Sequence, residues 1–196
     1  MKDNKPFILF IDGSQSVGKS SITKVLREKL GSTTLLDLSG VKDKTLEGKD
    51  KTYRYHKKIL QMLEETHECQ MNYVISRSYQ SEVVYCNLGY KPYTFDTQAN
   101  SLISEIQYLT KFYNVYFIIL TATEEQFKER LKRNKFCYNE FSVKNSLEQQ
   151  EEYKKALRYL SKETRNVRCF EIPTNYEIND VVDIIVNSIL TNMIGD

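Results

Sequence analysis

The chain has 196 residues, 40% of them hydrophobic, and its 28 basic and 26 acidic residues give a formal net charge of +2. This length supports one buried core, so we predict a single domain over residues 1–196. The nearly balanced charge does not indicate nucleic acid or an anionic membrane as a partner. The four cysteines are far apart and form no CxxC pair of zinc-binding spacing. No signal sequence and no run of about 18 apolar residues occurs, which favours a cytoplasmic protein.

The first predicted strand, FILFID from Phe7, leads into GSQSVGKS and then into a helix with apolar residues at helical spacing. The eight residues match GxxxxGK[ST], the phosphate-binding loop (P-loop), in the strand-to-helix context that this loop requires. Its backbone N–H groups and the helix N-terminus would bind the phosphates of ATP. Lys19 would reach the β- and γ-phosphates, and the Ser20 hydroxyl would bind Mg²⁺. The predicted ATP-binding residues are Gly13, Ser14, Gln15, Ser16, Val17, Gly18, Lys19, Ser20 and Ser21.

Further apolar runs alternate with helical patterns along the rest of the chain, as in βα units that form a parallel sheet. We therefore predict a three-layer α/β/α P-loop fold with a five-stranded parallel sheet. The polar stretches 39–51 and 135–145 are the longest irregular candidates, and we expect functional loops there. After the first strand, the predicted strands are TLLDL from Thr34, YVIS from Tyr73, VYFIILT from Val115 and VRCFEI from Val167.

A second protein ligand for Mg²⁺ is less clear than the first. VYFIIL runs into Thr121 and YVIS ends at Ser76, so neither strand ends in the acid that many P-loop proteins use. Asp12 and Asp37 are the nearest candidates, and each could equally be a carboxylate that caps a turn or a helix.

Four segments resemble the thymidylate kinase and deoxynucleoside kinase superfamily. DGSQSVGKS is similar to the EG-x4-GK[ST] start of both branches, and RSYQSEVVY from Arg77 is similar to the DR-x4-S-x3-Y stretch of thymidylate kinases and to the ERS stretch of deoxynucleoside kinases. ILTATEEQFKERLKRN from Ile119 resembles the strand, helix and start of the lid, and EQQEEYKKAL from Glu148 resembles the helix after it. The resemblance spans nearly the whole chain.

This resemblance implies roles for the residues after the third strand. Arg77 would hold the acceptor phosphate or steady the donor phosphates, because its planar fork suits bidentate contacts. Ser81 aligns with the family's serine, Glu82 would read the base edge, and Tyr85 would close against the sugar. Each residue has a structural alternative. Arg77 could form a salt bridge, Glu82 could be a solvated carboxylate, and Tyr85 could pack in the core.

The chain also departs from the family pattern. Ser76 replaces the acid of the DR or ER pair, and no Glu-Pro follows the second strand, which leaves Asp37 as the comparable acid and base candidate. The predicted mobile lid, about residues 130–145, carries a basic cluster. Because the P-loop itself has no arginine, we expect Arg130 and Arg133 to stabilise the transferring phosphoryl group. A solvated helix end is the alternative.

These features favour MgATP-dependent transfer of the γ-phosphoryl group to a deoxynucleoside monophosphate, because a monophosphate acceptor needs no strong general base. A deoxynucleoside kinase is the second interpretation. A P-loop protein that binds nucleotide without transferring phosphate is the third, and phosphorylation of a nucleic-acid end would need a basic groove that the composition does not indicate. The expected partner is a small nucleotide or nucleoside, and the oligomeric state stays open, with a homodimer as one candidate.

Overall fold

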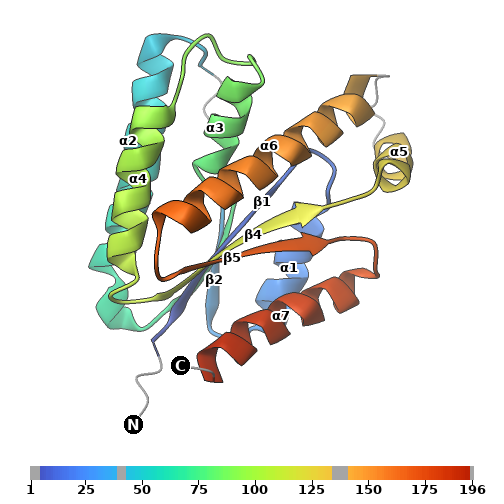
Figure 1. The fold of residues 1–196 in the computed structure, drawn as a ribbon. Coiled ribbons are helices and arrows are strands. Elements are labelled where there is room, and N and C mark those ends of the chain that lie inside the picture. The colour runs from blue at the N-terminus through green and yellow to red at the C-terminus, as the bar shows by residue number, and fades with distance from the viewer. Residues whose placement is uncertain (1–4, 39–42, 134–140, 195–196) are drawn as a thin grey trace.

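A computed structural model describes residues 5–38, 43–133 and 141–194. Its centre is a five-stranded parallel sheet with the order β2-β3-β1-β4-β5 (Figure 1). This confirms the predicted fold class and all five predicted strands, each within a residue or two of its expected start. In chain order, the strands and helices are β1 (Phe7–Gly13), α1 (Lys19–Lys29), β2 (Thr33–Asp37), α2 (Leu46–Glu65), η1 (His67–Cys69), β3 (Asn72–Ser76), α3 (Gln80–Asn87), α4 (Asp96–Leu109), β4 (Asn114–Thr121), α5 (Glu124–Arg133), α6 (Phe141–Glu163), β5 (Val167–Pro173) and α7 (Ile178–Ile194).

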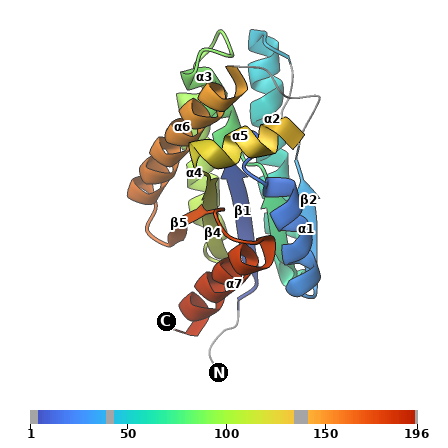
Figure 2. The ribbon, with the colours of Figure 1, turned by 90° about the vertical axis from the view of Figure 1, so that its right-hand side faces the viewer.

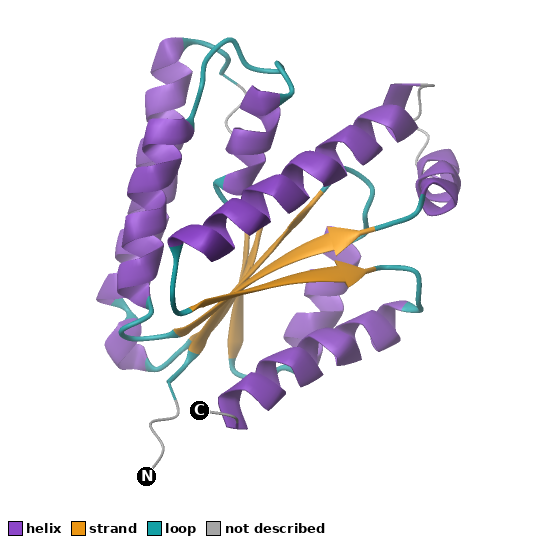
Figure 3. Ribbon diagram, in the orientation of Figure 1, coloured by secondary structure: helices purple, strands orange, loops and turns teal. Residues whose placement is uncertain are grey.

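The sheet is covered by helices on both faces, with α2, α3, α4 and α6 on one side and α1 and α7 on the other (Figure 3). Successive residues of β1 alternate between the two resulting cores. Ile8 and Phe10 pack on the first side, and Leu9 and Ile11 pack on the second. A strand buried on both faces is apolar at most positions, which explains the continuous apolar runs in the sequence.

The order of the strands determines where a ligand can bind. β1 lies at the centre of the sheet, between β3 and β4, so the connections after β1 and β4 leave in opposite directions. In open α/β sheets, the crevice at the carboxyl end of such a switch point is the usual ligand site. The turned view places α5 at this end of the sheet, between α6 and α1 (Figure 2).

The predicted lid, residues 130–145, falls only partly on described residues. Its first part belongs to the end of α5 and its last part to the start of α6, while residues 134–140 lie outside the described ranges. In the part of the chain that the structure describes, no helix combines the length and the apolar character needed to cross a bilayer.

Candidate functional site

The P-loop connects the carboxyl end of β1 to α1, and two glycines make its path possible. Gly13 has a φ of +144°, and a Cβ atom there would lie 2.7 Å from the Leu120 carbonyl oxygen. Gly18, the residue before α1, has a φ of +103°. Both conformations are costly for residues with a side chain. Any substitution at Gly13 would therefore disturb the loop and its packing against β4.

Lys19 begins α1, and its ammonium group turns back into the loop. Nζ donates hydrogen bonds to the carbonyl oxygens of Gly13 (2.6 Å) and Ser14 (2.7 Å). Burial lowers the pKa of Lys19 to about 8, although the carboxylate of Asp12 acts in the opposite direction. Burial disfavours the charged form of an amine. A phosphate that entered the loop would restore the stabilisation that water supplies to an exposed lysine.

Asp12, the residue before the loop, is completely buried. Its Oδ1 accepts hydrogen bonds from the backbone N–H of Ser78 (2.9 Å) and from the Ser81 hydroxyl (3.2 Å). Its Oδ2 has no hydrogen-bond partner among the described residues. Burial raises the pKa of the Asp12 carboxyl, and the hydrogen bonds with Ser78 act against this rise. Asp12 therefore ties the start of α3 to the P-loop and keeps one oxygen available.

Arg77 connects β3 to α3 in a strained conformation. Its φ of +69° lies in the left-handed region, which residues with a side chain rarely adopt. Its backbone N–H donates to the Ile11 carbonyl oxygen (3.0 Å), which extends the pairing of β3 with β1. The side chain is exposed and lines the same cleft as Lys19. Strain at such a position suits a residue that is held in place for a ligand.

The residues present can accommodate Mg²⁺. The Ser20 hydroxyl would hold the ion, as in other P-loops, and the unpaired Oδ2 of buried Asp12 offers a carboxylate oxygen close to Lys19. Asp37 is exposed at the end of β2, close enough to act on the charge of Lys19. Within the described ranges, no group of three or more His, Cys, Asp and Glu residues could hold a metal. Bound nucleotide phosphates would therefore have to supply much of the coordination.

The side of α3 that faces the loop carries a chain of hydroxyl groups. Tyr153 of α6 donates to the Ser81 Oγ (2.9 Å), and Ser81 donates in turn to Asp12. Because this network joins β1, α3 and α6, it sets the position of α3 relative to the P-loop. Tyr85, one helical turn after Ser81, is partly buried and lies near the charge of Arg77.

Glu82 is the next residue along α3, and its carboxylate is buried in a separate cluster. Oε1 accepts a hydrogen bond from the Tyr93 hydroxyl (2.5 Å) and pairs with the Lys91 ammonium (3.2 Å). Burial raises the pKa of the Tyr93 hydroxyl, and so does Glu82. Lys91 also donates to the Asp43 carbonyl oxygen (3.2 Å), at the start of the chain segment that leads into α2. A ligand that contacted Glu82 would therefore meet a paired carboxylate.

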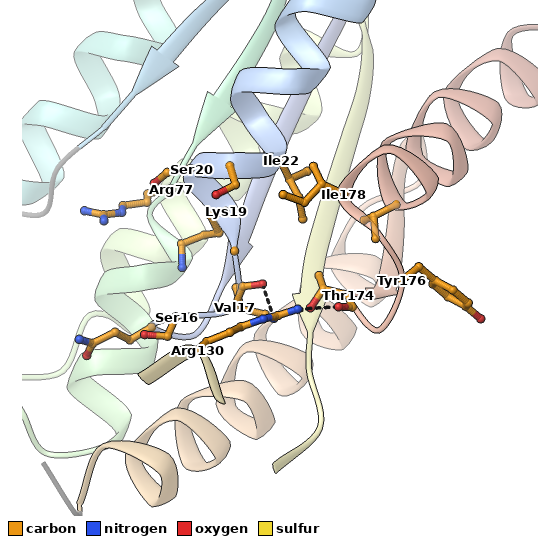
Figure 4. Close-up of a pocket in the computed structure, with 14 residues that line it drawn as sticks. Ser16, Val17, Lys19, Ser20, Ile22, Arg77, Arg130, Thr174, Tyr176 and Ile178 are labelled. Carbon is orange, nitrogen blue, oxygen red and sulfur yellow. Dashed lines mark hydrogen bonds between the residues drawn. The ribbon is translucent and has the colours of Figure 1, made fainter. Parts of the chain in front are cut away.

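Arg130 lies on the other side of the P-loop from Arg77 (Figure 4). Its guanidinium donates to the Val17 carbonyl oxygen (2.9 Å) and to the side chain (2.8 Å) and carbonyl oxygen (2.6 Å) of Thr174. It thus joins α5 to the loop and to the segment between β5 and α7. The Arg133 side chain lies outside the described residues. The placement of Arg130 favours a contact with the donor away from the transferring phosphoryl group.

One cleft of about 570 Å³ is lined by Lys19, Ser20, Arg77, Arg130, Thr174 and Tyr176, among other residues. The sequence located its P-loop and its arginines, but it gave no indication of Thr174 or Tyr176. The contacts of Lys91 with Glu82 and of Tyr153 with Ser81 were also missed. Tyr93 belongs to the aromatic segment GYKPYTF, in which a lone lysine is the feature that could have pointed to a buried charge pair.

No protein-family model and no curated protein matches the chain. Several solved structures are similar to it. YorR from Bacillus subtilis, solved with phosphorylated GDP, is 14% identical, with a TM-score of 0.67 over 94% of this chain and 96% of that chain. Thymidylate kinase from Candida albicans is 14% identical, with a TM-score of 0.62 over 96% of this chain and 92% of that chain. Deoxyadenosine kinase from M. mycoides with bound dATP is 13% identical, with a TM-score of 0.61 over 94% of this chain and 100% of that chain.

The chain has the fold of the thymidylate and deoxyadenosine kinases. This agrees with the resemblance in the sequence. In this fold, the cleft described above lies at the carboxyl end of the central strand β1 and is lined by residues 15–20 of the P-loop.

Proposed function

We propose that the protein is a kinase that uses ATP and Mg²⁺ to phosphorylate a deoxynucleoside monophosphate. The observation that carries this proposal is the placement of Lys19 and Arg77 in one cleft, with Arg77 on the side of the P-loop opposite Arg130 (Figure 4). Two cations so placed can bind the phosphates of a donor and an acceptor at the same time. The structural neighbours that are named as kinases add support.

The proposed mechanism relies on positioning and on neutralisation of charge. The P-loop N–H groups and Lys19 would bind the β- and γ-phosphates, and Ser20 and Asp12 would hold Mg²⁺, which neutralises charge on the phosphate oxygens. Arg77 would align the acceptor phosphate for in-line attack. Arg130 and Arg133 remain candidate cations for the transferring group, although the contacts of Arg130 suit binding of the donor nucleoside better.

The acceptor site would lie along α3. Ser81 and Tyr85 face the P-loop side of the helix, where Tyr85 could exclude a ribose 2′-hydroxyl by its bulk. Glu82 would act on the base through its pair with Lys91, so that the cluster presents both a hydrogen-bond acceptor and a donor. Asp37 remains a candidate contact for the acceptor at the end of β2.

A deoxynucleoside acceptor is the second candidate, and one observation favours it. The Oδ2 of Asp12 has no hydrogen-bond partner among the described residues, and burial raises the pKa of this carboxyl next to the P-loop, so Asp12 could serve as the general base that a 5′-hydroxyl requires. In a monophosphate kinase, the same oxygen would serve the metal.

The test is a panel of the common deoxynucleosides and their 5′-monophosphates with MgATP, read by ADP release. We expect one of the monophosphates to give a higher kcat/KM than any of the deoxynucleosides. The Lys19→Ala variant, purified in the same way, controls for contaminating kinases. Tight ATP binding with no transfer to any member of the panel would favour the protein that binds nucleotide without transferring phosphate.

A further inference from the structure

A second cleft, of about 350 Å³, lies between α3, α4 and α6. It shares no lining residue with the phosphate cleft. One of its walls is the side of α3 that faces away from the phosphate cleft. This side carries Gln80, Val83 and Asn87 at helical spacing. A space between packed helices that is lined by apolar groups and a few polar ones is a common setting for small-molecule sites.

Gln80 is the unusual residue of this cleft. It is fully buried, with no exposed surface, and neither its Oε1 nor its Nε2 has a hydrogen-bond partner within 3.5 Å in the described ranges, although the Tyr79 hydroxyl lies near this side chain. Its backbone N–H donates to the Ser78 hydroxyl (3.1 Å). A buried carboxamide with two unpaired groups destabilises a fold unless something else pairs with it. Gln80 borders the cleft, but its two polar atoms are covered, so a ligand could supply both missing partners only by displacing the groups that cover them.

The rest of the lining describes what such a ligand would be. Val83, Ala99, Ile103 and Ala156 provide apolar surface, and Tyr79 and Tyr159 add aromatic side chains. The Tyr159 hydroxyl donates to Asn100 (3.0 Å), which links α6 to α4 across the cleft. These walls suit a planar ring system.

The charges at the rim argue against a phosphate. Lys155 is the only cation in the lining, and it is paired with Glu152 (2.5 Å). Glu152 also accepts a hydrogen bond from Asn87 (3.3 Å). Asp96 adds a second carboxylate to the rim. With one neutralised lysine and two acids, the cleft should reject an anion and accept a neutral molecule.

We propose that this cleft is a second binding site, for a neutral planar heterocycle with an amide edge. The Gln80 carboxamide presents one donor beside one acceptor, and an edge with adjacent N–H and C=O groups pairs with both. Lactams and nucleobases have such an edge. The proposal of this site does not depend on the proposed function. The site lies on α3, on the side opposite Ser81 and Tyr85.

The test is an NMR titration of ¹⁵N-labelled protein with quinazolin-4(3H)-one and 2-quinolone, two neutral lactams. We expect the Gln80 side-chain amide and the backbone signals of residues around the cleft to shift in a saturable way. N-methylation of either lactam removes the N–H donor and should weaken binding about tenfold, as expected for the loss of one hydrogen bond. Because this comparison uses the native protein, it does not depend on how a variant folds.

Gln80→Leu should weaken binding of the unmethylated lactams about tenfold or more. Gln98→Leu is the matched control, because Gln98 also has a buried, unpaired Oε1 but does not line the cleft. It should bind as the native protein does. Equal binding of the methylated and unmethylated lactams, native affinity in Gln80→Leu, or no shift at the cleft up to the solubility limit of both compounds would overturn the proposal. So would a dimer, detected by sedimentation, whose formation shifts the same cleft signals, because a second copy of the chain would then be the occupant.

Discussion

The donor side and the acceptor side of the candidate site are built in different ways. On the donor side, one continuous segment, Gly13 to Ser20, supplies the loop, and its glycines and Lys19 act locally. On the acceptor side, side chains that are far apart in the sequence meet in pairs and chains, as in Asp12 with Ser81 and Tyr153. A backbone loop depends on few residues, whereas a side-chain network depends on every member. The two sides should therefore respond differently to substitution.

The largest expected effect is on the donor side. Lys19→Ala should fold and should lower kcat by about 10³-fold, because the ammonium stabilises charge that grows on the phosphate oxygens in the transition state. Single-turnover transfer from ATP is the measurement. Lys24→Ala, at an exposed position of the same helix, is the control and should keep native activity. Native turnover by Lys19→Ala would exclude the donor role of the P-loop.

The pH dependence should report the same lysine. Burial lowers the pKa of Lys19 to about 8, so kcat/KM for ATP should fall about tenfold per pH unit above that pH as the ammonium loses its proton. Below pH 8, Lys19 is charged, so its titration should not change the activity in that range. Asp12→Asn removes the carboxylate that raises this pKa, so it should move the fall to lower pH. A profile that stays flat up to about pH 9.5 would argue against a titrating Lys19.

Arg130→Ala should raise the KM for ATP about tenfold and change kcat less, because its contacts with Val17 and Thr174 form the wall of the donor cleft and do not reach Arg77. Lys128→Ala, at an exposed position of the same helix, controls for the general effect of charge on α5. A loss in kcat alone would instead assign Arg130 to the transferring phosphoryl group, as the sequence suggested.

A smaller effect is expected within the acceptor network. Tyr153→Phe removes the donor to Ser81 and should raise the KM for the acceptor about threefold, while the KM for ATP changes little. Tyr113→Phe is a matched control. It also removes a buried hydroxyl, one that donates to the Leu63 carbonyl oxygen away from the site. Both variants should lose some stability, and only the first should alter acceptor binding. Equal KM values in the two variants would show that Tyr153 has no more than a structural role.

The sequence could predict the fold and the donor side because their signals are local. The central strands β1 and β4 are apolar at nearly every position because both of their faces are buried, and the P-loop is a single contiguous motif. The acceptor side left weaker signals. Tyr153 reads as one apolar position of a long helix, and Lys91 as a charge in a turn. The contacts of Tyr153 depend on β1, α3 and α6 coming together, and those of Lys91 on α3 meeting the segment before α2, which no local pattern in the sequence shows.

The unexpected position of the acid also follows from packing. Ser76 ends β3 at the position where the DR or ER pattern that the sequence resembles has an acid, and its buried hydroxyl has no partner among the described residues. Asp12 comes from the neighbouring strand β1 and binds the turn that follows Ser76. No local pattern connects residues 12 and 78, so the sequence could offer Asp12 only as one candidate among others.

The central claim is that Arg77 holds an acceptor phosphate while the P-loop holds the donor. Arg77→Lys tests it most directly, because the substitution keeps the charge but removes the fork of donors. The measurement is kcat/KM for one deoxynucleoside and for its own 5′-monophosphate, with the native protein and the variant. We expect a loss of about 30-fold or more with the monophosphate and less than about threefold with the nucleoside. An equal loss with both acceptors would contradict the claim and would place Arg77 at the donor phosphates.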